Sequence, residues 1–172
     1  MSQSHQPFIL YDNQIFDIQR FGGISRYFCE ILRRLNMKKD IAVRYSVNYY
    51  LTTYRLGKHR IPLPRFIFKH YRKQCQNQNK ELSKNLLQQS NKYLFHPTYY
   101  DPYFLKYIGS NPYVITVHDM IHERFPSYFS DASEIIAHKK EVITHFLMPL
   151  QDLFYSQSWM ESILQEWLIL NQ

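Results

Sequence analysis

Residues 8–35, FILYDNQIFDIQRFGGISRYFCEILRRL, contain the pattern that decides the fold. The stretch begins with a short apolar run at 8–11, and its last part repeats apolar residues at the spacing of one helical face. Gly22-Gly23 lies between the two parts. The predicted apolar face carries Ile24, Tyr27, Phe28, Ile31, Leu32 and Leu35, and the predicted polar side carries Ser25, Arg26, Glu30, Arg33 and Arg34. We therefore expect a strand, a glycine turn and an amphipathic helix.

The glycine pair allows two interpretations. A helix N-terminus presents unpaired N–H groups and a partial positive charge, and glycines let a phosphate approach that backbone closely. Arg26, just inside the first turn, would add a cation. Alternatively, Gly22-Gly23 only makes a tight turn from strand to helix. The sequence contains neither GxGxxG nor GxxxxGK[ST], so the spacing leaves both interpretations open.

The segments that follow predict an α/β fold with a parallel sheet. Residues 41–50 alternate with a period of two and are rich in β-branched and aromatic side chains, which is typical of a strand. A strand, a helix and a second strand over this distance form a βαβ unit. Residues 93–95 and 113–117 are further strand candidates, and Asp131 begins a predicted helix whose apolar side includes Ile135 and Val142.

The overall composition is that of a globular protein. Of 172 residues, 45% are hydrophobic and 20% charged, which fits one domain with a substantial core. The formal charge of +7 points to an anionic partner: a nucleotide, a phospholipid surface or nucleic acid. Cys29 and Cys75 show no metal-binding spacing, which favours a reducing compartment. With no signal-peptide pattern and no apolar run long enough for a membrane span, we expect a cytoplasmic protein.

The segment from Arg55 to Lys80 contains no acidic residue. Its cations are interleaved with aromatic residues, a composition that suits contact with an anionic membrane surface. The same composition would suit a nucleic-acid backbone, but no nucleic-acid motif accompanies it, and we expect no nucleic-acid partner. A third interpretation is a solvated surface insertion, followed by a helix from about Glu81 to Lys92.

Candidate site residues follow three predicted strands. They are the Gly22-Gly23 loop with Arg26, the loop containing Tyr99, Tyr100 and Asp101, and His118-Asp119 after the strand at 113–117. In open α/β sheets, ligands bind outside the carboxyl ends of the strands. A single histidine at a strand end can also be purely structural, and neighbouring residues on a strand point to opposite faces. No zinc spacing, GxSxG motif or carboxylate pair is evident.

Three ordered motifs resemble bacterial family 4 glycosyltransferases, over about Phe8 to His145. They are residues 12–16 with 19–27 (DNQIF and QRFGGISRY), 95–102 (FHPTYYDP) and 114–123 (VITVHDMIHE). The resemblance implies the N-terminal half of a GT-B fold, a Rossmann-like domain that faces a second domain across a cleft. It implies transfer of a sugar from a nucleotide-diphosphate donor with retention of configuration, without a metal or other cofactor. The acceptor would be a polysaccharide or a lipid-linked glycan.

The same resemblance implies roles for individual residues. Gly22 and Gly23 would lie at the donor phosphate and acceptor, and His118 beside the transferred sugar, with Asp119 next to it. The chain departs from the family pattern after His145. We therefore expect a Rossmann-like domain at 1–145, a helical or loosely packed tail at 146–172 that carries Trp159 and Trp167, and no donor-binding domain. A frameshift would explain this departure.

Two functions follow from these expectations. The first is a glycosyltransferase fragment of cell-surface glycan biosynthesis, which we expect to be inactive as an isolated chain. The second is a non-catalytic module that binds anionic lipid through Arg55 to Lys80. Either would place the protein in the cytoplasm, peripherally on the inner face of the membrane in the second case.

Overall fold

The structure is a computed structural model that describes residues 8–38, 42–47, 50–54, 56, 64–89 and 92–151. The chain divides into two compact units. Unit 1 comprises Met1–Tyr99 and Tyr103–Ile115, and unit 2 comprises Tyr100–Pro102 and Thr116–Gln172.

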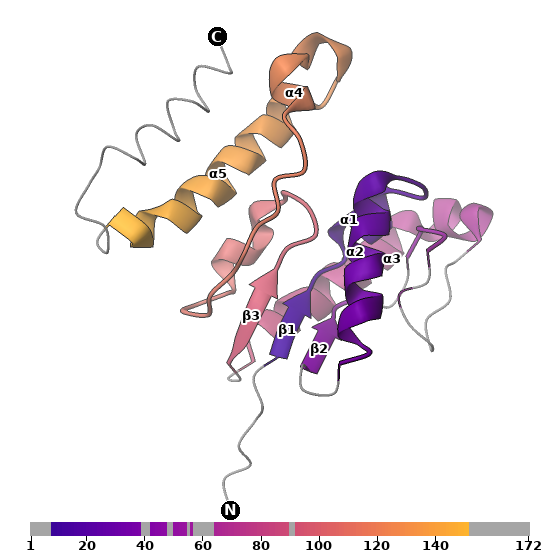
Figure 1. The fold of residues 1–172 in the computed structure, drawn as a ribbon. Helices are drawn as coiled ribbons and strands as arrows, with labels where there is room; N and C mark the ends of the chain where they lie inside the picture. The colour runs from indigo at the N-terminus through magenta and orange to yellow at the C-terminus, as the bar shows by residue number, and fades with distance from the viewer. Residues whose placement is uncertain are drawn as a thin grey trace, which may run out of the picture. The chain divides into compact units, whose positions relative to one another are not determined.

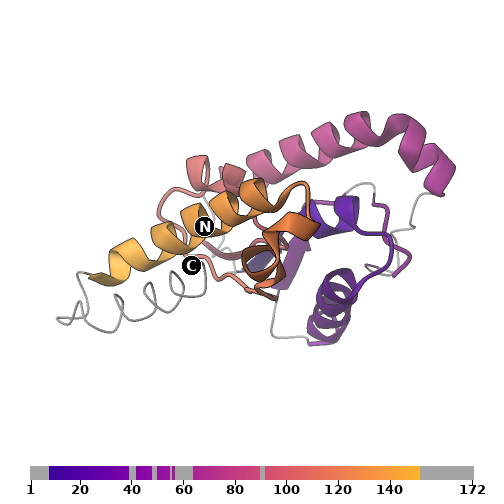
Figure 2. The ribbon, with the colours of Figure 1, turned by 90° about the horizontal axis from the view of Figure 1, so that it is seen from above.

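Unit 1 contains a parallel sheet of three strands, β1 (Phe8–Tyr11), β2 (Ala42–Tyr45) and β3 (Tyr93–His96). The strand order is β2-β1-β3, and Phe8 pairs with Ala42 on one side and with Tyr93 on the other (Figure 1). Helices α2 (Gly23–Leu35) and α3 (Arg65–Leu87) lie on opposite faces of this sheet (Figure 2). The short helix α1 (Gln14–Ile18) precedes α2, and the 3-10 helix η1 (Pro102–Lys106) follows β3. The predicted α/β fold with a Rossmann-like parallel sheet and flanking helices is confirmed.

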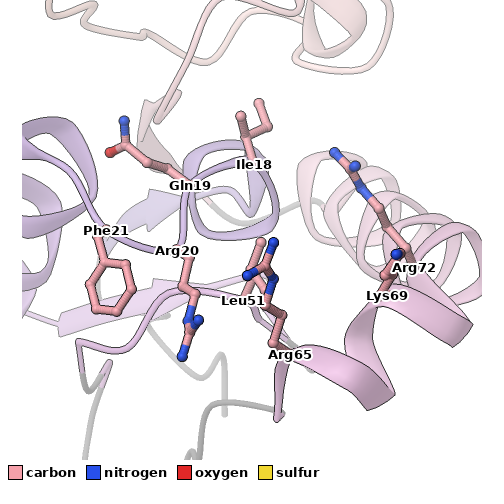
Figure 3. Close-up of a pocket in the computed structure, with 8 residues that line it drawn as sticks. All are labelled: Ile18, Gln19, Arg20, Phe21, Leu51, Arg65, Lys69 and Arg72. Carbon is pink, nitrogen blue, oxygen red and sulfur yellow. The ribbon is translucent and has the colours of Figure 1, made fainter.

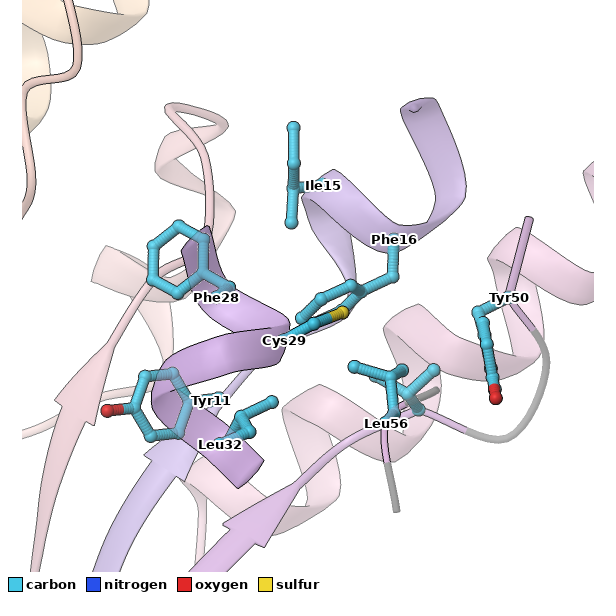
Figure 4. Packing of buried hydrophobic residues seen from close by; sticks show 9 residues of the cluster. Tyr11, Ile15, Phe16, Phe28, Cys29, Leu32, Tyr50 and Leu56 are labelled. Atoms are coloured by element: carbon cyan, nitrogen blue, oxygen red, sulfur yellow. The ribbon is translucent and has the colours of Figure 1, made fainter. Parts of the chain in front are cut away.

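The main core lies between the sheet, α1 and α2 (Figure 4). Phe16, Phe28 and Leu32 are fully buried there, and Tyr11 contributes its ring from β1. The buried face of α2 is turned slightly from the predicted one, because Ser25 is buried whereas Tyr27 is 42% exposed. The predicted position of Ser25 on the solvent side is therefore wrong. Its hydroxyl donates a hydrogen bond to the carbonyl of Gly22 at 3.2 Å, so this polar group has a partner inside the fold.

Helix α3 begins at Arg65, so the predicted start near Glu81 is wrong. Four residues on one side of the helix are buried: Cys75, Asn79, Ser83 and Leu87. Two of these are polar, so an apolar helical period is not visible in the sequence. The backbone leaves helical geometry at Tyr71, with φ −105° and ψ 15°, which bends the helix near its start. Arg55 and residues 57–63 of the predicted basic segment lie outside the described residues.

The predicted strand at 113–117 is also wrong. Only Tyr113 forms a bridge, to Phe95, with the Val114 N–H donating to the Phe95 carbonyl at 2.9 Å. Val114 and Val117 are 37% and 41% exposed. This segment is rich in residues with high β-propensity, but it is not a buried strand. The segment therefore pairs with β3 at a single position, Tyr113.

Unit 2 contains α4 (Ile121–Arg124), the 3-10 turn η2 (Pro126–Tyr128) and α5 (Ala132–Gln151). The predicted helix from Asp131 is confirmed, and Ile135 and Val142 are buried as expected. The helix continues past His145, where we expected the domain to end. The tail residues 152–172 lie outside the described residues. In the part of the chain that the structure describes, no helix is both long and apolar enough to cross a membrane.

Candidate functional site

The strand order creates a switch point at the centre of the sheet. From the central strand β1, the chain crosses to β2 on one side and then returns to β3 on the other. The loops that leave the carboxyl ends of β1 and β3 therefore diverge, and this divergence is where open α/β sheets bind ligands. The two loops begin at Asp12 and at Pro97. Both belong to unit 1 up to Tyr99.

A buried carboxylate ties these two loops together. Asp12 is fully buried, and its Oδ1 accepts hydrogen bonds from the Thr98 N–H at 2.8 Å and from the Thr98 hydroxyl at 2.6 Å. Its Oδ2 accepts from Gln14 Nε2 at 2.7 Å and from the Tyr103 hydroxyl at 3.3 Å. The Thr98 oxygen in turn accepts the Ile15 N–H at 3.2 Å. One acidic side chain thus connects β1, α1, the loop after β3 and η1.

A second buried network lies between α1 and α3. Asp17 accepts Asn13 Nδ2 at 2.5 Å and Asn79 Nδ2 at 3.0 Å. The Ser83 hydroxyl donates to Asn13 Oδ1 at 3.1 Å and also meets the Ser46 hydroxyl. The buried polar residues of α3, Asn79 and Ser83, therefore contact the loop after β1 and helix α1 through hydrogen bonds.

Burial changes the acidity of both carboxyl groups. It raises the pKa of Asp12, against the opposing effect of the hydrogen bonds from Thr98 and Gln14. It raises the pKa of Asp17 to about 7, against the hydrogen bonds from Asn13 and Asn79. Asp17 therefore keeps its proton well above the pH at which an exposed aspartate loses it. Neither carboxyl was among the predicted site residues, although Asn13 and Asp17 are four positions apart, the spacing of neighbours on one helical face.

The glycine loop is occupied by a side chain of the protein itself. Gln19 Oε1 accepts the Ser25 N–H at 3.1 Å, at the start of α2. A Cβ on residue 22 would lie 2.1 Å from the Gln19 Cδ, whereas a Cβ on Gly23 would meet nothing within 4 Å. Gly22 is thus required for the close approach of Gln19. A phosphate could reach the Ser25 N–H only after Gln19 moved aside.

The other predicted residues of unit 1 flank this loop. Arg26 is exposed on the first turn of α2, and its N–H donates to the Gly22 carbonyl at 3.1 Å. Tyr99 is half-buried and packs against the main core. Tyr100 and Asp101 belong to unit 2. Tyr100 is buried there, and Asp101 is half-buried.

In unit 2, the backbone of His118 is held by Tyr100, whose ring also contacts the buried Lys139. The His118 N–H donates to the Tyr100 hydroxyl at 3.0 Å. The ammonium of Lys139 lies 4.8 Å from the centre of the Tyr100 ring, donates to the Asp119 carbonyl at 2.9 Å and pairs with Glu123 at 3.0 Å. Both side chains of that ion pair are fully buried. Lys139 lies on the same side of α5 as the buried Ile135 and Val142. The apolar periodicity of the sequence therefore did not indicate that this lysine is buried.

His118 and Asp119 differ in their surroundings. Burial lowers the pKa of His118, with Lys139 acting in the same direction and Asp119 opposing. The neutral imidazole is therefore favoured at neutral pH. The Asp119 carboxylate is exposed and accepts the Ile121 N–H at 3.3 Å, so its observed contact is local, at the start of α4.

A basic pocket adjoins the glycine loop in unit 1 (Figure 3). Its volume is about 590 Å³. Arg65, Lys69 and Arg72 project from α3, and Arg20 projects from the loop after α1. Phe21 lines the pocket beside Arg20, whose guanidinium carbon lies 4.8 Å from the ring centre. The sequence showed these cations but not that Arg20 lines the same pocket.

No group of three or more metal-binding side chains occurs within the described ranges. Comparisons of the chain with protein-family models, with curated proteins and with solved structures found no match.

The packing of Gln19 predicts different outcomes at the two glycines. Gly22→Ala should displace Gln19 and leave the Ser25 N–H without its cap, which costs about 1 kcal/mol of the free energy of unfolding. Gly23→Ala should change that free energy by less than about 0.5 kcal/mol or raise it, because alanine is the better helix former. Urea denaturation of both variants measures the difference. Equal losses would contradict the assigned role of Gln19.

The raised pKa of Asp17 predicts a pH dependence of stability. An unfolded chain loses this proton near pH ~4, whereas the folded chain keeps it to about pH 7. Between these values only the folded state binds the proton, so the free energy of unfolding should fall as pH rises, by about 1.4 kcal/mol per pH unit at most from this group. Asp12 contributes with the same sign.

Asp17→Asn should therefore weaken the fall in stability between pH 5 and pH 7, as measured by urea denaturation at both values. The matched control is Asp131→Asn, at an exposed position before α5, which should leave the fall unchanged. A fall of the same size in Asp17→Asn and in the natural chain would show that Asp17 titrates normally.

Proposed function

We propose that this chain provides the N-terminal, acceptor-side domain of a retaining family 4 glycosyltransferase of cell-surface glycan biosynthesis. The observation that carries the proposal is the switch point of the sheet β2-β1-β3. The segments that resemble the family at 12–27 and 95–102 contain the two loops that diverge there. A nucleotide-diphosphate sugar would be the donor, and a polysaccharide or lipid-linked glycan the acceptor.

The chemistry of such a transfer sets requirements that the site residues can meet. The bond between the anomeric carbon and the diphosphate breaks, and negative charge grows on the leaving group, which needs hydrogen-bond donors and cations. The Ser25 N–H and Arg26 supply these at the start of α2, once Gln19 has moved from its position on that N–H. A neutral His118 can donate a hydrogen bond to a sugar hydroxyl without adding a charge.

In a GT-B enzyme, groups from two domains stabilise the leaving diphosphate. We therefore expect this chain alone to bind a donor or an acceptor without measurable transfer. Turnover by the purified chain that His118→Ala abolished would contradict that expectation.

Amide chemical shifts provide the direct test of the proposed site. The isotope-labelled chain is titrated with UDP-glucose, GDP-mannose and dTDP-rhamnose in turn. At least one should shift the amides of Gly22, Gly23 and Tyr99, because these residues border the switch point. Gly109 is the control: it precedes Asn111, whose Oδ1 accepts the Tyr93 N–H at the opposite, amino end of β3. The proposal fails if no donor shifts the loop amides, or if Gly109 shifts as much.

A second candidate function is attachment to an anionic membrane surface, favoured by the first part of α3. Phe66 and Tyr71 are 73% and 51% exposed there. Arg65, Lys69, Arg72 and Lys73 form no ion pair with any carboxylate among the described residues. Exposed aromatic rings between unpaired cations suit the interface of a bilayer with acidic headgroups.

Cosedimentation with vesicles tests the membrane function. Binding should be strong to phosphatidylcholine vesicles that contain phosphatidylglycerol, weak to phosphatidylcholine alone, and reduced by added salt. Phe66→Ser should weaken it severalfold. Phe125→Ser is the matched control, since Phe125 is 54% exposed and belongs to unit 2, whereas the basic segment belongs to unit 1. Equal binding to both vesicle types would exclude an electrostatic membrane contact.

A further inference from the structure

The basic pocket concentrates positive charge; among its cations, Arg72 interacts electrostatically with the carboxyl of Asp17. The lining of the pocket includes Arg20, Arg65, Lys69 and Arg72 but no carboxylate. None of these four cations forms an ion pair with a carboxylate elsewhere in the described part of the chain. Like charges that converge on one concave surface raise the local potential and attract an anion. The pocket therefore fits a ligand with at least two negative charges.

The backbone holds the cations in a defined arrangement. Arg65 and Lys69 are one turn apart in the first part of α3, and Arg72 follows the bend at Tyr71; all three line the pocket. Arg20 belongs to the loop after α1. The Arg20 carbonyl accepts the Thr53 N–H at 3.1 Å and the Thr52 hydroxyl at 3.3 Å, and these bonds hold the loop in position. Cations from two separately anchored elements can contact one anionic group from two sides. Guanidinium groups suit phosphate in particular, because their parallel N–H donors match two of its oxygens.

The pocket is larger than a phosphate group requires. Its volume of about 590 Å³ lies in the ~300–1,000 Å³ range of small-molecule sites. Apolar side chains line the remaining space: Leu51 is half-buried, and Ile18 and Phe21 are 49% and 61% exposed at the rim. Exposed apolar rim residues beside an anion site favour a ligand in which the phosphate carries an apolar group.

We propose that the basic pocket binds the phosphate or pyrophosphate of an amphipathic ligand. Arg65, Lys69 and Arg72 hold the charged group together with Arg20, and Phe21 and Leu51 contact the apolar part. This site adjoins the start of α2, because Gln19, whose Oε1 accepts the Ser25 N–H, also lines the pocket. The proposal does not depend on sugar transfer, so it stands even if the proposed function fails.

Calorimetric titration of the full chain tests the proposal with three probes. Inorganic pyrophosphate represents the shared chemistry, geranyl pyrophosphate a lipid-linked source, and UDP a nucleotide source. We expect pyrophosphate to bind and geranyl pyrophosphate to bind at least about tenfold more tightly, because its chain buries apolar surface on Phe21 and Leu51. UDP should bind no more tightly than pyrophosphate.

Matched variants separate the pocket from general positive charge. The triple change Arg65→Gln, Lys69→Gln and Arg72→Gln should weaken pyrophosphate binding by at least about 100-fold, since each removes a charge-assisted hydrogen bond. The control triple change removes the same charge from exposed positions outside the pocket, as Lys38→Gln, Lys92→Gln and Lys106→Gln, and should weaken binding less than about threefold. Lys69→Arg keeps the charge and should retain binding.

Three results would overturn the proposal. The first is no detectable binding of pyrophosphate by the natural chain. The second is an equal loss of binding in the two triple variants, which would mean that net charge alone attracts the anion. The third is equal affinity for pyrophosphate and geranyl pyrophosphate, or tighter binding of UDP, which would contradict the apolar contacts. Circular dichroism confirms that each variant is folded before it is titrated.

Discussion

The hydrogen bonds between Asp12 and Thr98 are the interaction on which the rest of unit 1 depends. β1 ends at Tyr11 and β3 ends at His96, so this pair lies where the two chains leave the sheet in different directions. Two short bonds to one carboxylate oxygen, at 2.8 Å and 2.6 Å, keep the diverging loops at a fixed separation. The positions of the glycine loop and of Tyr99 depend on this pair. The hydrogen bonds of Asp17 connect the same region to α3.

The parts of the fold that the sequence predicts are those where one periodicity dominates. The run at 8–11, the face of α2 that includes Phe28 and Leu32, and the apolar side of α5 all follow from apolar spacing. The parallel sheet follows from the order of these segments. The motif at 12–27 begins in the loop that follows β1, at the carboxyl edge of the sheet. Its glycines, however, have a different immediate role: Gly22 makes room for Gln19.

The remaining parts of the fold and of the candidate site were not predictable from the sequence because polar residues hold them together. Asn79 and Ser83 face inward from α3, and Lys139 lies on the apolar side of α5, so hydrophobic periodicity misplaces or overlooks all three. Residues 113–117 have strong β-propensity but pair with β3 at only one position, because strand formation depends on a partner and not on propensity alone. The basic pocket joins residues about 45 to 50 positions apart, a convergence that spacing along the chain does not reveal.

A double-mutant cycle on Asp12 and Thr98 tests the central claim most directly. Asp12→Asn, Thr98→Val and the double variant are compared with the natural chain by urea denaturation at one pH. If the two side chains hold the diverging loops together, the coupling energy should be about 1–3 kcal/mol, as for contacting groups in one buried hydrogen-bond network. Thr98→Ser, which keeps the hydroxyl, should retain most of the stability. Additive losses, with a coupling energy near zero, would show that the loops are held by other contacts and would contradict the account.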